Sequence, residues 1–218
     1  MAKVVIFGTR DTAELAAFYL RHDSPHEVVA FTVNAAFQAG DTFDGLPVVA
    51  FERLEERFPP AEVSCFIPMT ARRMNAARRE ILEQVRSRGY GCISYVSSKA
   101  TVLNDRMGEN CFILEHNVIQ PRAVIGDNVM MWSGNHIGHH SVIGDHAFIT
   151  SHVVISGHCH IGPHCFLGVN ATVRDGIDMA EGTFLAMASA LTRDSRPWSV
   201  YRGNPARRLR LDSRRFNP

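Results

Sequence analysis

An aliphatic residue occupies every sixth position from Met107 to Leu191, fifteen times in succession and without an insertion. The series is Met107, Ile113, Ile119, Ile125, Met131, Ile137, Ile143, Ile149, Ile155, Ile161, Leu167, Val173, Met179, Leu185 and Leu191. Neither an α-helix nor an amphipathic strand has a period of six. Such a repeat predicts a β-helix, a prism of short strands joined by corners.

Each hexad is expected to supply one short strand and one corner. The aliphatic residue and the fifth residue of the hexad point inward, where a narrow prism leaves no room for bulk. The fifth residue is accordingly small in most hexads: Cys111, Ala123, Ser141, Ala147, Cys159, Cys165, Ala171, Thr183 and Ser189. If three hexads close one turn, residues three hexads apart stack at about 4.8 Å, the distance between neighbouring strands. The fifteen hexads then build five coils.

Length and composition limit what else the chain can be. Its 218 residues allow two domains, and a hydrophobic fraction of 45% is enough for a core in each. The net charge of +1 argues against a nucleic-acid partner. No apolar run approaches the ~20 residues of a membrane span, and the short first run predicts a strand rather than a signal peptide. Three of the five cysteines occupy inward positions of the repeat, which predicts packing thiols and a cytoplasmic location.

The first hundred residues have a different pattern, in which short apolar runs alternate with helical segments. The predicted strands are 4–7, 27–33, 46–49, 63–68 and 92–96, and the predicted helices are 13–20 and 72–88. This alternation favours a small α/β domain of Rossmann-like outline. We therefore expect an α/β domain at 1–98, an all-β parallel β-helix at 99–195 and a C-terminal tail at 196–218.

In an open α/β sheet, ligands bind beyond the carboxyl ends of the strands. The loops at these ends contain the candidate substrate-binding residues Gly8, Thr9, Arg10, Asn34, Met69 and Thr70. The first loop lacks the G-x-G-x-x-G pattern, so we predict no dinucleotide cofactor. A helix N-terminus at this loop can instead hold the diphosphate of a nucleotide-linked sugar.

Two motifs, together with this domain order, resemble a known family. The repeats contain Asn-His-Ile-Gly-His-His-Ser-Val-Ile-Gly at 135–144, and Gly-Asn-Pro-Ala-Arg follows the coils at 203–207. The chain thus resembles the bacterial sugar acyltransferases of the left-handed β-helix, or hexapeptide-repeat, family. These are related to sialic acid O-acetyltransferase and to the N-acetyltransferases of nucleotide-linked amino sugars. The resemblance implies a left-handed coil, a homotrimer and acetyl-CoA as the acyl donor.

Nine of the eleven histidines lie between His116 and His164. Six occupy the fourth place of a hexad, and we expect most of them to be solvated corner residues or to form hydrogen bonds between subunits: His116, His140, His146, His152, His158 and His164. His139 instead occupies the third place, and Gly157 occupies the same place three hexads later, at the same corner.

Acyl transfer needs a base for the attacking amine or hydroxyl and a hydrogen-bond donor for the oxyanion of the thioester carbonyl. An imidazole exchanges protons near neutral pH, and a glycine N–H can be approached closely. The resemblance assigns these roles to His139 and Gly157. It gives the residue after the base, here His140, an orienting role.

The spacing of three hexads also predicts a cofactor groove. Gly168 stacks on Ala186 and Asn170 on Ala188, and small residues of this kind let a pantetheine arm lie against the backbone. The predicted cofactor-binding residues are Gly157, Gly168, Asn170, Ala186, Ala188, Arg202 and Asn204.

We therefore expect an enzyme that transfers an acetyl group from acetyl-CoA to an amino or hydroxyl group of a nucleotide-linked sugar, with no metal. Transfer is expected to be direct, because no cysteine or serine is placed as an acyl carrier. One alternative is a trimer that binds zinc through His136, His139 and His140 and performs hydration chemistry. A second alternative is a sugar-binding scaffold without catalysis.

Overall fold

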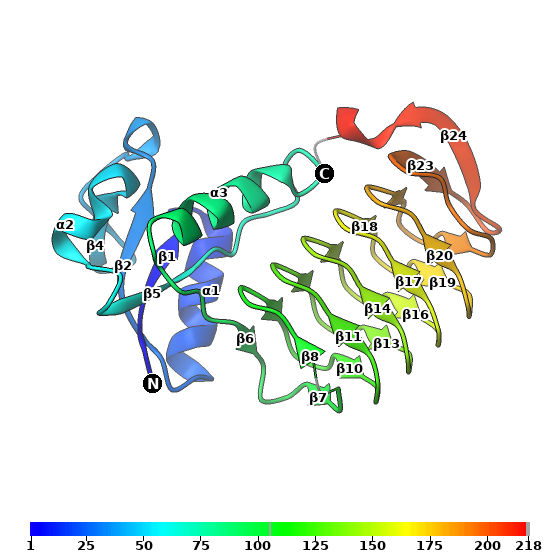
Figure 1. Ribbon diagram of the computed structural model, residues 1–218, viewed down its shortest axis with the longest axis horizontal. Helices are drawn as coiled ribbons and strands as arrows, with labels where there is room; N and C mark the ends of the chain where they lie inside the picture. Colours follow the sequence, from blue (N-terminus) through cyan, green and yellow to red (C-terminus); the bar gives the residue numbers. More distant parts are fainter. Residues whose placement is uncertain (105, 217–218) are drawn as a thin grey trace.

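The computed structural model describes residues 1–104 and 106–216. The molecule has two parts, an α/β unit and a β-helix, arranged along its longest axis (Figure 1). Among the described residues, no helix combines the length and apolar character needed to cross a membrane.

The α/β unit is built on a five-stranded sheet with the order β3-β4-β2-β1-β5. Its strands are β1 (Lys3–Phe7), β2 (Glu27–Val33), β3 (Thr42–Phe43), β4 (Leu46–Ala50) and β5 (Val63–Phe66). All neighbouring strands are parallel except β3 and β4. The helices are α1 (Asp11–His22), α2 (Leu54–Arg57) and α3 (Ala76–Ser87), with short 3-10 turns at Ala35–Phe37 and Phe51–Arg53. The predicted alternation of strands and helices is confirmed.

Several boundaries in this region differ from the prediction; the strand expected at 63–68, for example, ends at Phe66. The helix expected from residue 72 begins at Ala76, because Arg73, Met74 and Asn75 adopt left-handed φ values of 53°, 49° and 68° that an α-helix cannot contain. The strand expected at 92–96, as the last of the α/β unit, is reduced to β6 (Tyr95–Val96). This strand pairs with the β-helix, and within the described segment 92–96 only Cys92 keeps a parallel bridge to Cys65 of β5.

The β-helix has three faces, which we name A, B and C. Face A contains β7 (Thr101–Val102), β10 (Val118–Ile119), β13 (His136–Ile137), β16 (Val154–Ile155), β19 (Thr172–Val173) and β22 (Ala190–Leu191). Face B contains β8 (Arg106–Met107), β11 (Val124–Ile125), β14 (Val142–Ile143), β17 (His160–Ile161) and β20 (Asp178–Met179). Face C contains β6, β9 (Phe112–Ile113), β12 (Met130–Met131), β15 (Phe148–Ile149), β18 (Phe166–Leu167), β21 (Phe184–Leu185), β23 (Ser199–Arg202) and β24 (Arg207–Asp212). A 3-10 turn at Ser213–Arg215 follows β24.

The predicted register is confirmed throughout the repeat. Each strand pairs in parallel with the strand three hexads later, for example His136 with Val154 and Ile137 with Ile155. The hexad aliphatics form one interior core, and all are buried except Met107, which packs against that core while partly exposed. We name the three edges of the prism by the faces that they join: AB, BC and CA.

The fourth residue of the hexads has a left-handed backbone. The φ angles of Asn128, His140, His158 and Asn170 are 59°, 57°, 55° and 58°. Asparagine, histidine and glycine tolerate this conformation better than most residues do. The histidine-rich corners therefore have a backbone cause that is independent of chemistry.

An apolar column on face C joins the β-helix to the α/β unit. The outward residues of successive strands on this face are Phe112, Met130, Phe148, Phe166 and Phe184. The first three are buried in one cluster with α1 and the sheet. The ring of Phe66 in β5 meets that of Phe112 edge-on, with 5.3 Å between centroids. Burial of these rings accounts for the docking of the two parts.

Helix α3 adds a buried polar contact at edge BC. Arg78 is fully buried and donates hydrogen bonds to the main-chain oxygens of Asn128 (3.2 Å), His146 (2.8 Å) and Met69 (3.0 Å). Within the described chain, no carboxylate pairs with this guanidinium. Burial lowers the pKa of Arg78 to about 9, so its charge persists at neutral pH and is balanced by carbonyl dipoles.

The same helix covers two of the corner histidines. His164 is 4% exposed and His146 is partly buried, and their ring centroids lie 4.8 Å apart. The expectation of solvated corners is wrong for these two, because α3 lies over edge BC. It is confirmed for the exposed residues His116, His140, His152 and His158. Burial lowers the pKa of His146 to about 3 and also lowers that of His164.

These shifts predict an acid-sensitive contact. A histidine titrates near 6.5 in the unfolded chain but stays neutral in this fold, so the unfolded state binds more protons between pH 6.5 and about 3. The free energy of unfolding therefore falls as the pH decreases through that window. We expect His146→Asn, which suits the left-handed backbone, to flatten this fall in urea denaturation from pH 7 to 4. His116→Asn, at an exposed corner, is the control, and equal slopes for His146→Asn and the unaltered protein would contradict the assignment.

Candidate active site

His139, His140, Gly157 and His158 lie together at edge AB, on two successive coils. The coils are held in register by the His158 N–H, which donates to the His139 carbonyl at 2.9 Å. The His139 N–H donates to Oε1 of Gln120 at 2.9 Å, which fixes the corner from the coil before. The regular backbone of the β-helix therefore positions the candidate base without a loop.

The three imidazoles at this edge contact one another. Nδ1 of His139 lies 3.1 Å from Nδ1 of His140, so one ring donates and the other accepts. The His140 and His158 rings stack with centroids 4.9 Å apart, and the His139 ring is nearly perpendicular to both. His140 is thus placed to orient His139 through a hydrogen bond.

Gly157 lies between the candidate base, one coil before it, and a carboxylate one coil after it. A Cβ at Gly157 would lie 2.9 Å from Nε2 of His139 and 3.0 Å from Oδ1 of Asp175. The imidazole and the carboxylate therefore both reach the space beside one glycine. Gly157 is buried, and within the described residues its N–H donates no hydrogen bond.

The predicted cofactor residues other than Gly157 gather on edge CA. Gly168, Asn170, Ala186 and Ala188 occupy successive coils there, and Arg202 and Asn204 are exposed in the segment that continues this edge. That segment is joined to the last corner, because the Gly203 N–H donates to Oγ of Ser189 at 2.9 Å. In one chain these residues and His139 thus lie on different edges.

Gly168 has a packing role of its own. A Cβ there would lie 2.5 Å from the backbone nitrogen of Met187 in the next coil. Glycine at this position is therefore required by the stacking of the coils.

The predicted substrate-binding residues lie at one edge of the α/β sheet. Gly8, Asn34 and Met69 follow β1, β2 and β5, which are neighbours in the sheet, so their loops lie at the same carboxyl end. The Gly8 N–H donates to the Thr32 carbonyl, and Gly8 has a φ of 127°. Thr9 and Arg10 continue this first loop, and Thr70 the third, where its carbonyl and that of Met69 accept hydrogen bonds from Arg78.

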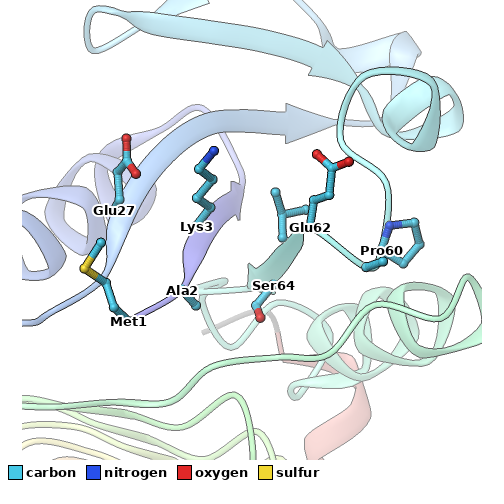
Figure 2. Close-up of a pocket in the computed structure, with 9 residues that line it drawn as sticks. Met1, Ala2, Lys3, Glu27, Pro60, Glu62 and Ser64 are labelled. Atoms are coloured by element: carbon cyan, nitrogen blue, oxygen red, sulfur yellow. The ribbon is translucent and has the colours of Figure 1, made fainter.

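Two open hollows lie elsewhere. One of about 550 Å³ is at the amino ends of the strands, where Glu27, Lys3 and Glu62 point to the same side of the sheet (Figure 2). The other, of about 750 Å³, lies against β24 and Trp198 and is lined by several arginines. Both are away from His139, and neither contains a predicted site residue.

The histidines also form a group that can hold a metal ion. His139, His140 and His158 each offer a nitrogen, and these nitrogens lie within 4.8 Å of one another. The zinc alternative named His136 instead of His158. His136 lies in β13 on face A and does not belong to this group.

Sequence reasoning missed Asp175, His158, Gln120 and Arg78 as neighbours of functional groups. Asp175 lies one coil after Gly157, and His158 lies one coil after His140, so the spacing that paired His139 with Gly157 also contains both. Gln120 and Arg78 make their contacts through long side chains, and the repeat spacing does not predict which residues such side chains contact.

Residues 122–157 and 140–175 match the family described as bacterial transferase hexapeptide (six repeats). These matches include the corners that carry His139, Gly157 and Asp175. A search of curated proteins found no match to this sequence.

Several solved structures are similar over nearly the whole chain. The acetyltransferase domain of PglB from Neisseria gonorrhoeae has a TM-score of 0.84 and 20% identity, covering 96% of this chain and 100% of that chain. PerB from Caulobacter crescentus, solved in complex with CoA and GDP-perosamine, has a TM-score of 0.83 and 22% identity, covering 96% and 98%. WeeI from Acinetobacter baumannii has a TM-score of 0.80 and 17% identity, covering 96% and 100%. The chain thus contains bacterial transferase hexapeptide repeats and shares, over nearly its whole length, the fold of these proteins.

Proposed function

We propose that this protein transfers an acetyl group from acetyl-CoA to an amino group of a nucleotide-linked sugar. The observation that carries the proposal is the position of the His139 imidazole beside Gly157 on the next coil, whose N–H donates no hydrogen bond to the described residues. The similar fold of PerB, which was solved with CoA and GDP-perosamine, supports the choice of both substrates.

The chemistry follows from the positions of these groups. The sugar amine attacks the thioester carbonyl directly, while a His139 nitrogen takes a proton from the amine. The Gly157 N–H donates a hydrogen bond to the oxyanion, and the C–S bond then breaks. The leaving thiolate takes the proton held by His139, which releases the CoA thiol and restores the base. The hydrogen bond from His140 holds the His139 ring and sets which of its nitrogens carries a proton.

Asp175 favours an amine over a hydroxyl as the acceptor. Its carboxylate approaches the same glycine as the His139 imidazole does. A negative charge this close to the base attracts a protonated amino group, which a hydroxyl does not offer. O-acetylation remains the second possibility for this site.

The separation of the two edges supports a homotrimer. Acetyl-CoA that follows the small residues of edge CA reaches a base on edge AB only if a second copy supplies one of the two edges. We propose that three left-handed β-helices pack side by side with an active site in each cleft. Light scattering should then give a trimer, and a stable monomer at micromolar concentration would contradict the shared site.

The α/β unit is proposed to hold the nucleotide. The loops at Gly8–Arg10, Asn34 and Met69–Thr70 lie at the carboxyl end of its sheet, where ligands of Rossmann-like domains bind. We propose domain boundaries near residues 98 and 195. All five cysteines are free thiols, consistent with a reaction in the cytoplasm, where we place it.

The proposal is tested by measuring thiol release from acetyl-CoA against a panel of nucleotide-linked amino and deoxy sugars. We expect release that depends on an amino sugar in the panel. Release that is independent of every acceptor, or no release with any of them, would contradict the proposed function.

Gly157→Ala keeps the His139 imidazole but displaces it, so this variant tests whether the position of the proposed base matters. The new methyl group would lie 2.8 Å from Cε1 of His139, so the imidazole must turn away while the backbone can stay in place. We expect turnover to fall by about tenfold to a hundredfold, a part of the ~10²–10⁴ that general base catalysis contributes. Steady-state kinetics should show this fall in turnover, and thermal unfolding should show that the stability of the variant is unchanged. Normal turnover would show that catalysis does not depend on the close approach of the His139 ring to Gly157.

A further inference from the structure

We propose that His139, His140 and His158 form a site for one divalent transition-metal ion of the Zn²⁺ class, and that its occupation inhibits the enzyme. Metal binding itself is independent of the proposed function, whereas inhibition rests on His139 being the base. The site is distinct from the zinc alternative, since it lies within one chain and uses His158.

The spacing of the three rings suits a metal ion. Their candidate ligand nitrogens lie within 4.8 Å of one another, and the His139 and His140 Nδ1 atoms are 3.1 Å apart. Nitrogens bound to tetrahedral zinc at about 2.0–2.1 Å are roughly 3.3 Å apart, so the rings need only small rotations. All three side chains are exposed, which leaves a path for the ion and a fourth position for water.

The backbone under these rings is already ordered. His140 and His158 have nearly equal φ angles of 57° and 55°, and the His158 N–H is bonded to the His139 carbonyl. The backbone therefore already holds the three ligands close together. No loop has to fold before they can bind one ion. The nearby Asp175 carboxylate adds a favourable charge for a cation.

A metal ion bound to His139 would prevent this residue from acting as a base. A neutral imidazole has one nitrogen with a free lone pair and one that carries hydrogen. When the lone pair of His139 coordinates the metal, neither nitrogen can accept a proton from the acceptor amine. The ion would thus inhibit by occupying the proposed base itself.

Binding is tested first and without reference to activity. Co²⁺ titrated into the full chain by calorimetry should bind with one ion per chain, with visible absorption bands typical of nitrogen ligation. In His158→Ala the affinity should fall by at least about tenfold, the lower limit for losing even an outer partner of a metal site. His152→Ala is the matched control, because His152 is an exposed histidine at the same hexad place with a φ of 58°. No binding, equal affinity in His158→Ala, or loss in the control would overturn the site.

Inhibition is tested second, by thiol release at increasing Zn²⁺. Because the His158 ring stacks on that of His140, the activity of each protein without metal is measured first, and inhibition is expressed relative to that value. On this scale His158→Ala should require at least about tenfold more Zn²⁺ for half inhibition than the unaltered protein. Equal sensitivity of the two proteins would overturn the inhibitory role. If no acetyl transfer is found, the proposed function fails while the Co²⁺ titration still decides the metal site.

Discussion

Replacing His139 with alanine is expected to lower the turnover of acetyl transfer by about two to four orders of magnitude, the usual contribution of a general base. The imidazole lies directly over Gly157, with a hydrogen bond to His140 and an anchored backbone N–H. The affinity for acetyl-CoA should change little, because the base acts on the acceptor. Turnover and CoA binding, measured by steady-state kinetics and calorimetry, check the two parts separately.

The loss of turnover in His139→Ala should become smaller as the pH rises. An amine acceptor loses its proton to solvent at high pH and then depends less on the enzyme base. His140→Ala, which removes only the orienting partner, should cost much less than His139→Ala. If His139→Ala keeps near-normal turnover while His140→Ala or His136→Ala abolishes it, the base has been assigned to the wrong residue.

Arg78→Met is expected to lower the free energy of unfolding by about 3–5 kcal/mol. The substitution removes the buried donor that α3 presents to edge BC and leaves several carbonyl oxygens without a partner, each at a cost of about 1–3 kcal/mol. Urea denaturation measures the loss. Hydrogen exchange should show it first at the junction of α3 and the β-helix.

Two further variants show whether the loss comes from this contact. Arg78→Lys keeps the charge but has fewer donors and no planar fork, so its stability should lie between those of the methionine variant and the unaltered protein. Arg72→Met, at an exposed position just before α3, should change stability by less than about 0.5 kcal/mol. An Arg78→Met protein as stable as the unaltered chain would show that the carbonyl oxygens find other partners.

The coils could be predicted in detail because one physical rule repeats in them. The inward aliphatic, the small fifth residue and the turn of three hexads follow from a narrow prism, and the structure has them in every coil of the repeat. The docking of the α/β unit was not predicted. Phe112, Phe148, Phe166 and Phe184 recur at the outward place of face C, but this spacing alone does not say that the α/β unit covers them.

The candidate site could be predicted where it depends on backbone register. His139 and Gly157 were paired by their separation, and the structure places the ring over the glycine. The contact of His139 with His140 and the burial of His146 depend on side-chain rotamers and on the position of α3. Neither follows from a one-dimensional repeat.

The central claim is tested most directly by following an isotopically labelled acetyl group. The protein is incubated with labelled acetyl-CoA and nucleotide-linked amino sugars, and the products are identified by mass spectrometry. We predict that the label appears on the sugar amine in an amount equal to the CoA released, and that His139→Ala forms little of this product. CoA released without a labelled sugar, or equal labelling by the His139→Ala protein, would contradict acetyl transfer by this site.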